Sequence, residues 1–493
     1  MKSGFYLVFG LCFGLSLSSR AVTRYVNINS LEPATPYTNW LTAATNIQDA
    51  IDVSGSGDLI LVTNGLYKTG SRTIVDSTPC RVVVDKPLTI RSINGPAATS
   101  IEGFSLPGSF PWSLDSVRCA FLTNGAALVG FTLTNGSVRA TTYLNLGDPA
   151  GGVYSSSSDA MISNCVVANC AAYAGGGAES GTFVHCLITN CVAHIGGAGA
   201  YSANLVQCEV IWNTSDYYAG GLYYCNATNC NIIDNLGMVG GGAYGGAISH
   251  CNVCGNYAPF TQGLGGGYGG GIDNVDARDS IIYYNLADSG GNDIATGTYT
   301  NCCCPDLAVS DGNITNAPLF IDTVSFPGNF HLQTNSPCIN AGNNAFDQDT
   351  TDLDGRPRIV GAKTDIGAYE FQGANTNSFL VWLRSHNLLA DISSDAMDPD
   401  ADGLNNWQEW RAGTDPGSAA SVLKMLSVGG SASGLDVSWQ SATNVFYYLQ
   451  RSTNLSASFS SVKSNIVGQA GTTTTQDAGA TGPGPFYYRV GVQ

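Results

Sequence analysis

Five cysteines recur along the middle of the chain at almost constant steps. Cys165, Cys186, Cys208, Cys230 and Cys251 are separated by 21, 22, 22 and 21 residues. An aliphatic side chain follows each cysteine after two residues, and Cys or Asn follows it after five. The aliphatic residues are Val167, Ile188, Val210, Ile232 and Val253, and the later ones are Cys170, Cys191, Asn213, Asn235 and Asn256. A repeat of this length indicates a solenoid in which each period makes one coil.

Each repeat predicts a short β-strand, because its cysteine and the aliphatic residue two positions later lie on the same side of an extended chain. Strands of successive coils would stack in parallel about 4.8 Å apart, so equivalent residues form columns that point inward. The asparagines are expected at a corner, in left-handed backbone. The helical half and the leucine pattern of leucine-rich repeats are missing. We therefore expect an all-β fold, a right-handed single-stranded parallel β-helix.

A short helix is expected ahead of the first coil. Asn46 is a suitable N-cap, and Ile47 and Ile51 lie on one face of a helix that ends near Asp52. Strands are expected at residues 60–62 and 88–90. The helix would cap the first coil, whose open strand edge otherwise favours aggregation.

Two sets of motifs resemble known families. The segment from Asn46 to Tyr67 is similar to the opening of bacterial right-handed parallel β-helix repeat proteins, the pectin-lyase-like superfamily. The motifs Ser336-Pro-Cys-Ile-Asn-Ala-Gly342, Asp352-Leu-Asp-Gly-Arg-Pro-Arg358 and Asp365-Ile-Gly-Ala-Tyr-Glu-Phe371 resemble the closing module of bacterial surface β-helices of the choice-of-anchor Q type. The resemblance implies this architecture and export to the surface more than it implies an activity.

The first 21 residues have the features of an export signal. Lys2 precedes an apolar run from Phe5 to Leu17, and Ser19-Arg20-Ala21 fits a signal-peptidase site. This run is too short to span a bilayer, and no later stretch is long enough. We therefore expect a secreted or cell-surface protein that does not span the membrane. A net charge of −17 disfavours nucleic acid as a partner and suits calcium, neutral glycans or a basic partner.

The twelve residues from Asp398 to Glu409 have the spacing of an EF-hand calcium loop. Asp398, Asp400, Asp402, Asn406 and Glu409 offer side-chain oxygens, Leu404 offers its carbonyl, and Gly403 makes the turn. The segment resembles the calcium loops of dockerin-like and thrombospondin-type-3-like linkers, but dockerins carry two loops and only one is found here. We expect a structural calcium ion at a domain joint, with an acidic, solvated linker as the alternative. The acidic run Asp347, Asp349, Asp352 and Asp354 leaves open either a second calcium ion or a solvated loop.

Composition changes divide the chain into four parts. The expected parts are a signal peptide (1–21), the β-helix with its closing module (22–372), the calcium-loop segment (373–421) and a small β-sandwich (422–493). Alternating strands near residues 435–439, 447–451 and 486–490 predict the sandwich. It resembles fibronectin-type-III-like C-terminal modules.

Fifteen cysteines remain after the signal, so they cannot all pair within one chain. Disulfides between stacked cysteines stay open at a coil spacing of about 4.8 Å. Metal binding by residues 302–304, or by Cys251 with Cys254, is less favoured than simple filling of the core.

Outward columns of the solenoid are the places where a ligand could bind. One polar column precedes the cysteines, and several aromatic residues flank it. The predicted ligand-binding residues are Asn164, His185, Gln207, Asn229, His250, Trp212, Tyr223 and Tyr224. Amides bind sugar hydroxyls and aromatic rings stack on sugar faces, so we expect binding of a polysaccharide or cell-surface glycan, or adhesion. Any solenoid also has polar outward columns, which is the competing explanation.

A polysaccharide-degrading enzyme is the alternative function. Its weak catalytic candidates are Glu209, Asp234, Asp273, Asp276 and Asp279, since glycosidic hydrolysis needs two carboxylates roughly 5 to 10 Å apart. A lyase is less favoured than a hydrolase, because no Lys or Arg occurs between Arg139 and Arg278 to serve as the base.

Overall fold

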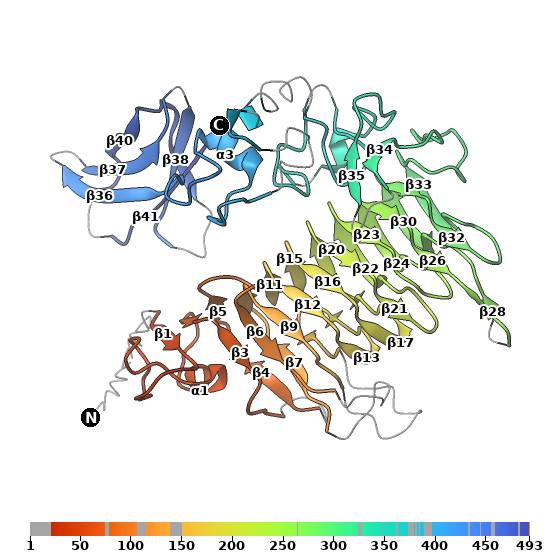
Figure 1. The fold of residues 1–493 in the computed structure, drawn as a ribbon, viewed down its shortest axis with the longest axis horizontal. Coiled ribbons are helices and arrows are strands. Elements are labelled where there is room, and N and C mark those ends of the chain that lie inside the picture. The colour runs from red at the N-terminus through yellow and green to blue at the C-terminus, as the bar shows by residue number, and fades with distance from the viewer. Residues whose placement is uncertain are drawn as a thin grey trace, which may run out of the picture. The chain divides into compact units, whose positions relative to one another are not determined.

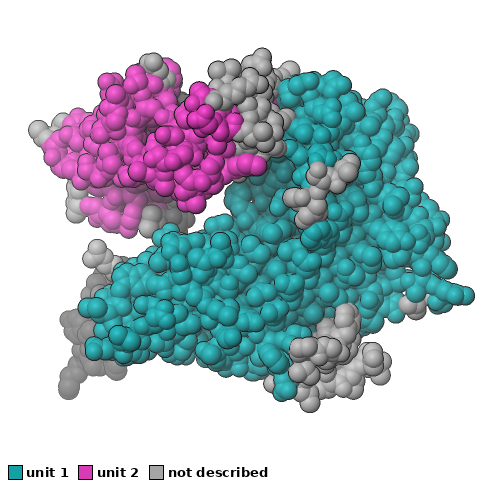
Figure 2. Space-filling model, in the orientation of Figure 1, with its two compact units in different colours: residues 1–371 teal, residues 372–493 magenta. Residues whose placement is uncertain are grey.

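The computed structural model describes residues 21–73, 78–105, 115–138, 150–263, 265–323, 328–347, 349–360, 363–372, 379, 382–383, 385–388, 397–431, 434–443, 445–454, 459–481 and 484–492. The predicted signal sequence lies outside the described residues except for Ala21. The chain divides into two compact units, residues 1–371 and residues 372–493 (Figure 2). No helix among the described residues is both long and apolar enough to cross a membrane.

The first unit is a parallel β-helix whose successive coils stack side by side (Figure 1). Sheet A has two columns of parallel strands. The first column contains β1 (Thr23–Val26), β2 (Leu59–Val62), β5 (Thr89–Ser92), β8 (Ala127–Val129), β11 (Met161–Ser163), β15 (Thr182–Val184), β19 (Asn204–Val206), β30 (Val275–Arg278) and β33 (Gly297–Thr300). The second contains β4 (Cys80–Val84), β7 (Arg118–Leu122), β10 (Val153–Ser155), β14 (Ala178–Glu179), β18 (Ala200–Tyr201) and β29 (Ile272–Asp273). The longer strands β22 (Leu222–Thr228) and β24 (Ala243–Ser249) run through both columns.

Two further faces complete each coil. Sheet B is a nine-stranded parallel sheet of β3 (Gly65–Tyr67), β6 (Thr99–Glu102), β9 (Thr132–Thr134), β12 (Val166–Ala168), β16 (Leu187–Thr189), β20 (Glu209–Ile211), β23 (Asn231–Ile233), β25 (Asn252–Cys254) and β31 (Ile281–Tyr283). The third face has β13 (Ala171–Ala174), β17 (Val192–Gly196) and β21 (Thr214–Ser215), then β26 (Tyr257–Ala258) and β32 (Leu286–Ala287). A hairpin of β27 (Phe260–Thr261) and β28 (Gly265–Gly266) extends from one late coil. The predicted parallel β-helix is therefore confirmed by the strand register.

Helix α1 (Ile47–Asp52) caps the first coil, as expected. The Asn46 side chain accepts a hydrogen bond from the backbone N–H of Asp49, and Ile47, Ala50 and Ile51 are buried. Burying this face removes apolar surface from water, which favours the cap by roughly 25 cal/mol per Å².

The cysteine column lies at the corner between sheet A and sheet B. The backbone N–H of Cys186 donates to Sγ of Cys208 at 3.4 Å, and that of Cys208 donates to Sγ of Cys230 at 3.3 Å. All 15 described cysteines are buried and none forms a disulfide. They fill the core as small apolar groups.

The asparagine column lies at the next corner and forms a continuous hydrogen-bonded ladder. Asn213, Asn235, Asn256 and Asn285 are each at most 3% exposed. In each step, a backbone N–H and a side-chain Nδ2 donate to Oδ1 of the next asparagine, and the last step ends on Asp293. The expected left-handed backbone is found one residue earlier, at Trp212, Asp234 and Tyr284, so the prediction for the asparagines themselves is wrong. Each asparagine points its side-chain amide into the core to reach the next coil. The residue before it adopts the left-handed backbone that turns the chain at this corner.

A closing segment, residues 318–371, follows the last coil. It contains β34 (Phe320–Asp322), β35 (Asn329–Leu332) and the short helix η1 (Asn344–Phe346). Its Phe320, Leu332, Cys338 and Ile366 pack in one cluster with Ile211, Ile233, Cys254 and Ile281 from sheet B. The outer face of sheet B is thus covered by the chain itself over its later strands, β20, β23, β25 and β31.

The second unit contains helix α3 (Asn406–Ala412) and two antiparallel three-stranded sheets. One sheet has β36 (Met425–Ser431), β37 (Gly434–Ser441) and β40 (Gly471–Asp477), and the other has β38 (Phe446–Ser452), β39 (Ser460–Val467) and β41 (Tyr487–Val492). Val437, Trp439, Tyr447, Leu449 and Ile466 form their shared core. The Tyr447 hydroxyl donates to the carbonyl of Ala412, which joins the end of α3 to this core.

Candidate functional site

Five tyrosines gather on the outside of sheet A, and we call them the tyrosine surface: Tyr201, Tyr218, Tyr223, Tyr224 and Tyr244. Tyr223 lies at the centre, with its ring centroid 5.4 Å from that of Tyr201, 5.6 Å from Tyr218 and 4.6 Å from Tyr224. Tyr244 contacts Tyr223, Tyr224 and Tyr218 in turn. Tyr218 and Tyr224 are 36% and 48% exposed. Burial, followed by the neighbouring tyrosines, raises the pKa of Tyr223 to about 12, so the central ring is uncharged at neutral pH.

The polar column predicted to bind a ligand is exposed on some coils and buried on others. Asn164 and His185 are exposed on the early coils. Gln207, Asn229 and His250 are buried beneath the closing segment.

The covered residues bind the chain's own groups. Gln207 Nε2 donates to Oγ1 of Thr351 at 3.0 Å, and Asn229 Nδ2 donates to Oδ2 of Asp349 at 3.1 Å. His250 Nε2 lies 3.0 Å from Oδ1 of Asp347. Over these coils the polar column holds the closing segment against the β-helix and is not open to a ligand.

Trp212 does not join the tyrosine surface. It lies at the corner after sheet B, is 40% exposed and has left-handed backbone. Its indole hydrogen-bonds to Asp234, which partly offsets the rise that burial causes in the pKa of that carboxyl. Tyr223 and Tyr224 are therefore the predicted aromatic residues that the fold brings together. Tyr218 is one of the aromatic residues that flank the polar column in the sequence. Tyr201 and Tyr244 were missed, although an alternating outward pattern in β18 and β24 would have identified them.

The candidate catalytic carboxylates are spread over several faces. Glu209 points outward from sheet B, where burial raises its pKa and Asn231 lowers it in part. Asp234 is at the opposite corner of the coil. Asp279 is fully buried and accepts a hydrogen bond from the backbone N–H of Asn343 in the closing segment.

Asp273 and Asp276 differ from the others because they lie on the outside of one coil, in β29 and β30. Asp273 accepts hydrogen bonds from Thr296, and Asp276 accepts one from the Thr298 hydroxyl. A hollow of about 260 Å³ opens beside Asp276, with Asn226, Ser249, Arg278 and Phe346 in its lining. The Arg278 guanidinium lies over the Phe346 ring, 5.3 Å from its centroid.

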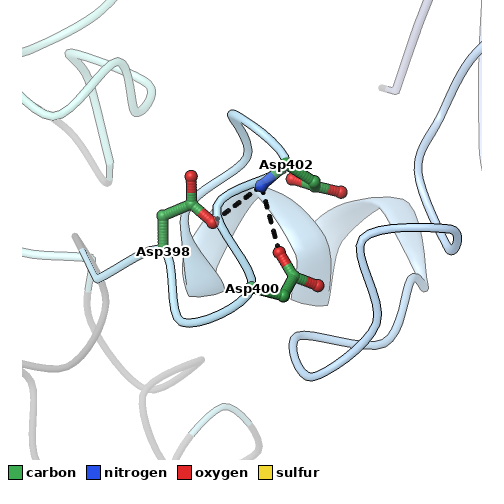
Figure 3. A group of neighbouring side chains, drawn as sticks. All are labelled: Asp398, Asp400 and Asp402. Atoms are coloured by element: carbon green, nitrogen blue, oxygen red, sulfur yellow. Dashed lines mark hydrogen bonds between the residues drawn. The ribbon is translucent and has the colours of Figure 1, made fainter. Parts of the chain in front are cut away.

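In the acidic loop of the second unit, carboxylates accept hydrogen bonds from the loop's own backbone N–H groups (Figure 3). The backbone N–H of Asp402 donates to Oδ1 of Asp398 and to Oδ1 of Asp400, both at 3.2 Å. Asp398 also accepts from the N–H of Gly403, and Asp402 Oδ1 accepts from that of Leu404. One carboxylate oxygen each from Asp398, Asp400 and Asp402 lies within 4.8 Å of the others. This is the only group of three or more acidic, His or Cys side chains with ligand spacing among the described residues.

Glu409 completes the acidic loop from the first turns of α3. Its side chain is fully buried, and its Oε2 has no hydrogen-bond partner, like Oδ2 of Asp400 and of Asp402. Burial, followed by the three neighbouring aspartates, raises the pKa of Glu409 to about 7. Buried carboxylate oxygens without donors are costly unless a cation lies between them. The residues therefore fit a hard cation bound by oxygen.

By its strand register, the protein belongs to the class of parallel β-helix proteins. No protein-family model matches the chain, and no curated protein matches it. Among solved structures it is similar to pectate lyase Pel9A, with a TM-score of 0.45 and 16% identity over 71% of this chain and 97% of that one. A rhamnogalacturonan lyase (TM-score 0.36, 12% identity, 75% and 100% covered) and pectin methylesterase PemA from Erwinia chrysanthemi (0.31, 11%, 61% and 94%) are also similar. At these values the likenesses carry no conclusion about activity.

Proposed function

We propose that this chain is a secreted or surface-exposed glycan-binding protein, and that the tyrosine surface is its binding site. The observation that carries the proposal is the group of five contacting rings, four from β18, β22 and β24 and one from Tyr218 just before β22, with two of the five more than one-third exposed. Aromatic rings present broad apolar faces with polar edges, a chemistry that suits the faces and hydroxyls of sugars.

Tyr224→Ala tests this site. Loss of one exposed stacking ring is expected to weaken glycan binding by about tenfold, because an aromatic contact contributes about 0.5–1.5 kcal/mol beyond its buried area. Retention of the protein on a panel of plant, algal and host polysaccharides identifies a ligand, and calorimetry then compares the variants.

Tyr284→Ala is the matched control. Tyr284 is also left-handed and 46% exposed, but it contacts Tyr283 and Phe320 instead of the tyrosine surface. Equal weakening by both substitutions, or none by Tyr224→Ala, would place binding elsewhere.

A glycoside hydrolase is the second candidate, and the position of Asp276 beside an open hollow, with Asp273 on the same coil, favours it. The same polysaccharide incubations distinguish it, since hydrolysis releases new reducing ends whereas binding does not. If new ends appear and Asp276→Asn abolishes them while retention persists, the protein is a hydrolase.

We further propose that the loop from Asp398 to Glu409 binds a structural calcium ion. The unpaired, buried Oε2 of Glu409 beside three aspartates supports this assignment. Asp398, Asp400, Asp402, Asn406 and Glu409 would offer side-chain oxygens, and Leu404 its carbonyl. Because the end of α3 is joined to Tyr447, the ion would also brace the sandwich.

Asp400→Ala is expected to reduce calcium affinity at least tenfold in titration calorimetry. In the wild type, calcium at about 100 times its Kd should add about 2.7 kcal/mol to the free energy of unfolding of the second unit. Asp415→Ala removes an exposed carboxylate just beyond α3 and should leave binding unchanged. Unaltered affinity in Asp400→Ala would disprove the assignment.

A further inference from the structure

A single outward column of sheet A carries the central part of the tyrosine surface. In register, on five successive coils, it holds Glu179, Tyr201, Tyr223, Tyr244 and Asp273. We call this column the acid–tyrosine ladder. Neighbouring rungs are one parallel-strand spacing apart, so the ladder spans about 19 Å along the solenoid axis.

The three rings of the ladder present a continuous apolar strip. The centroids of Tyr201 and Tyr223 are 5.4 Å apart with their planes at 27°, and those of Tyr223 and Tyr244 are 5.7 Å apart at 44°. A ligand that contacts all three rings must cross the strands and run along the axis. Tyr218 and Tyr224 widen the strip beside Tyr223.

The two charged rungs of the ladder, Glu179 and Asp273, are both acidic. No Lys or Arg occurs in the sequence between Arg139 and Arg278, a stretch that includes all five rungs. Arg278 belongs to the other column of sheet A, where its guanidinium lies over Phe346. A polyanionic ligand laid along the strip would therefore meet a carboxylate rung at each end, and none of the three tyrosine rungs between them is cationic.

We propose that the ladder binds an uncharged, hydroxyl-rich glycan along the solenoid axis, with sugar faces on the three tyrosines and hydroxyls donating hydrogen bonds to Glu179 and Asp273. This inference rests on the proposed glycan-binding function and adds the class of glycan and its direction. Carboxylates accept strong hydrogen bonds from hydroxyls but repel carboxylates and sulfates at the low dielectric of a protein surface.

The experiment is calorimetry of the full chain with two sets of probes of equal length. One set contains neutral hexasaccharides of glucan, xylan, mannan and galactan, and the other is hexagalacturonate. We expect at least one neutral hexasaccharide to bind at least tenfold more tightly than hexagalacturonate at low ionic strength, with a smaller difference in high salt. Affinity for the neutral glycan should rise with chain length and level off once the glycan spans the ladder.

The double variant Glu179→Gln, Asp273→Asn keeps side-chain oxygens that accept hydrogen bonds but removes both charges. It should weaken neutral binding only modestly and strengthen hexagalacturonate binding several-fold. Tyr223→Phe, which keeps the ring, should retain most of the affinity, whereas Tyr223→Ala should lose it.

The outcomes separate the two proposals. If hexagalacturonate binds as tightly as any neutral probe, and Tyr224→Ala weakens it, the tyrosine surface binds glycan but the class inferred here is wrong. If no neutral probe binds, the inference is also overturned. If neither set binds and no polysaccharide retains the protein, the proposed function itself fails.

Discussion

Asn235→Ala is expected to lower the free energy of unfolding of the β-helix by about 3 kcal/mol. Oδ1 of Asn235 accepts from both the backbone N–H and Nδ2 of Asn213, and Nδ2 of Asn235 donates to the carbonyl of Val210 and to Oδ1 of Asn256. Alanine removes the acceptor of the buried Asn213 backbone N–H and the side-chain donor to the Val210 carbonyl, at about 1–3 kcal/mol for each unsatisfied group. The lost amide also leaves a small cavity, which adds to the effect.

Asn226→Ala is the control for that substitution. Asn226 lies in the same coil, is exposed, and makes a single side-chain bond to Asn204 across adjacent strands. Its loss should change stability by less than about 0.5 kcal/mol. Hydrogen exchange of the amides in coils 213–256 is the better measurement, because coils of a solenoid can open locally. Similar exchange in both variants would show that the ladder is not a main source of stability.

The sequence predicted the columns of the solenoid because they are periodic. Cysteine, aliphatic and asparagine positions recur with each coil, and a parallel ladder places equivalent residues above one another. The N-cap at Asn46 was also predictable, because the residues that indicate it lie within a few positions of one another in the sequence. The left-handed residue before each asparagine was missed, because that position varies among Trp, Asp, Gly and Tyr.

The fate of the polar column was not predictable from periodicity. Gln207 and Asn229 have partners 144 and 120 residues later in the chain. The repeat contains no information about where a non-repeating segment will fold back. The sequence therefore indicated polar outward residues correctly but could not tell those left open, such as Asn164, from those that the closing segment covers.

The acidic loop is a local feature, and its twelve-residue spacing already identified the three aspartates that the structure brings together. The tyrosine surface was predictable only in part. Tyr223 and Tyr224 were identified, but Trp212 was grouped with them because linear proximity does not reveal which face of a coil a residue occupies. Register across coils, not distance in sequence, brings Tyr201, Tyr223 and Tyr244 together.

The closing segment should bind the β-helix more tightly in mild acid than in mild base. Asp279 is completely buried between the two, and this burial raises its pKa from 3.8 to about 7, although the N–H of Asn343 acts in the opposite direction. Because the folded pKa lies above the unfolded one, the stability that Asp279 contributes is complete below about pH 4 and is lost as the pH rises through 7. From about pH 5.5 to about pH 8.5 the loss is about 2 kcal/mol.

Neighbouring groups modify this pH dependence. Burial also raises the pKa of Asp352 to about 7 and of Glu370 to about 8, so both act in the same direction as Asp279. Burial lowers the pKa of His250, which faces Asp347, Asp279 and Arg358, so its contribution is complete above pH 6.5 and falls in acid. Because three carboxyls act in one direction and His250 alone acts in the other, the net effect is a decline in stability as the pH rises from about 5 to about 8.

Asp279→Asn isolates the carboxyl because it keeps an oxygen that can accept from Asn343 but cannot ionise. The variant should match the wild type below about pH 4 and exceed it in stability at higher pH. It should lack the loss of about 2 kcal/mol that the wild type shows between about pH 5.5 and about pH 8.5. Proteolysis and amide exchange of residues 343–371, corrected for the intrinsic pH dependence of exchange, measure the attachment directly. If the closing segment of the wild type is equally protected at both pH values, ionisation of Asp279 has no cost in the folded state. Its burial would then not govern how the closing segment is attached.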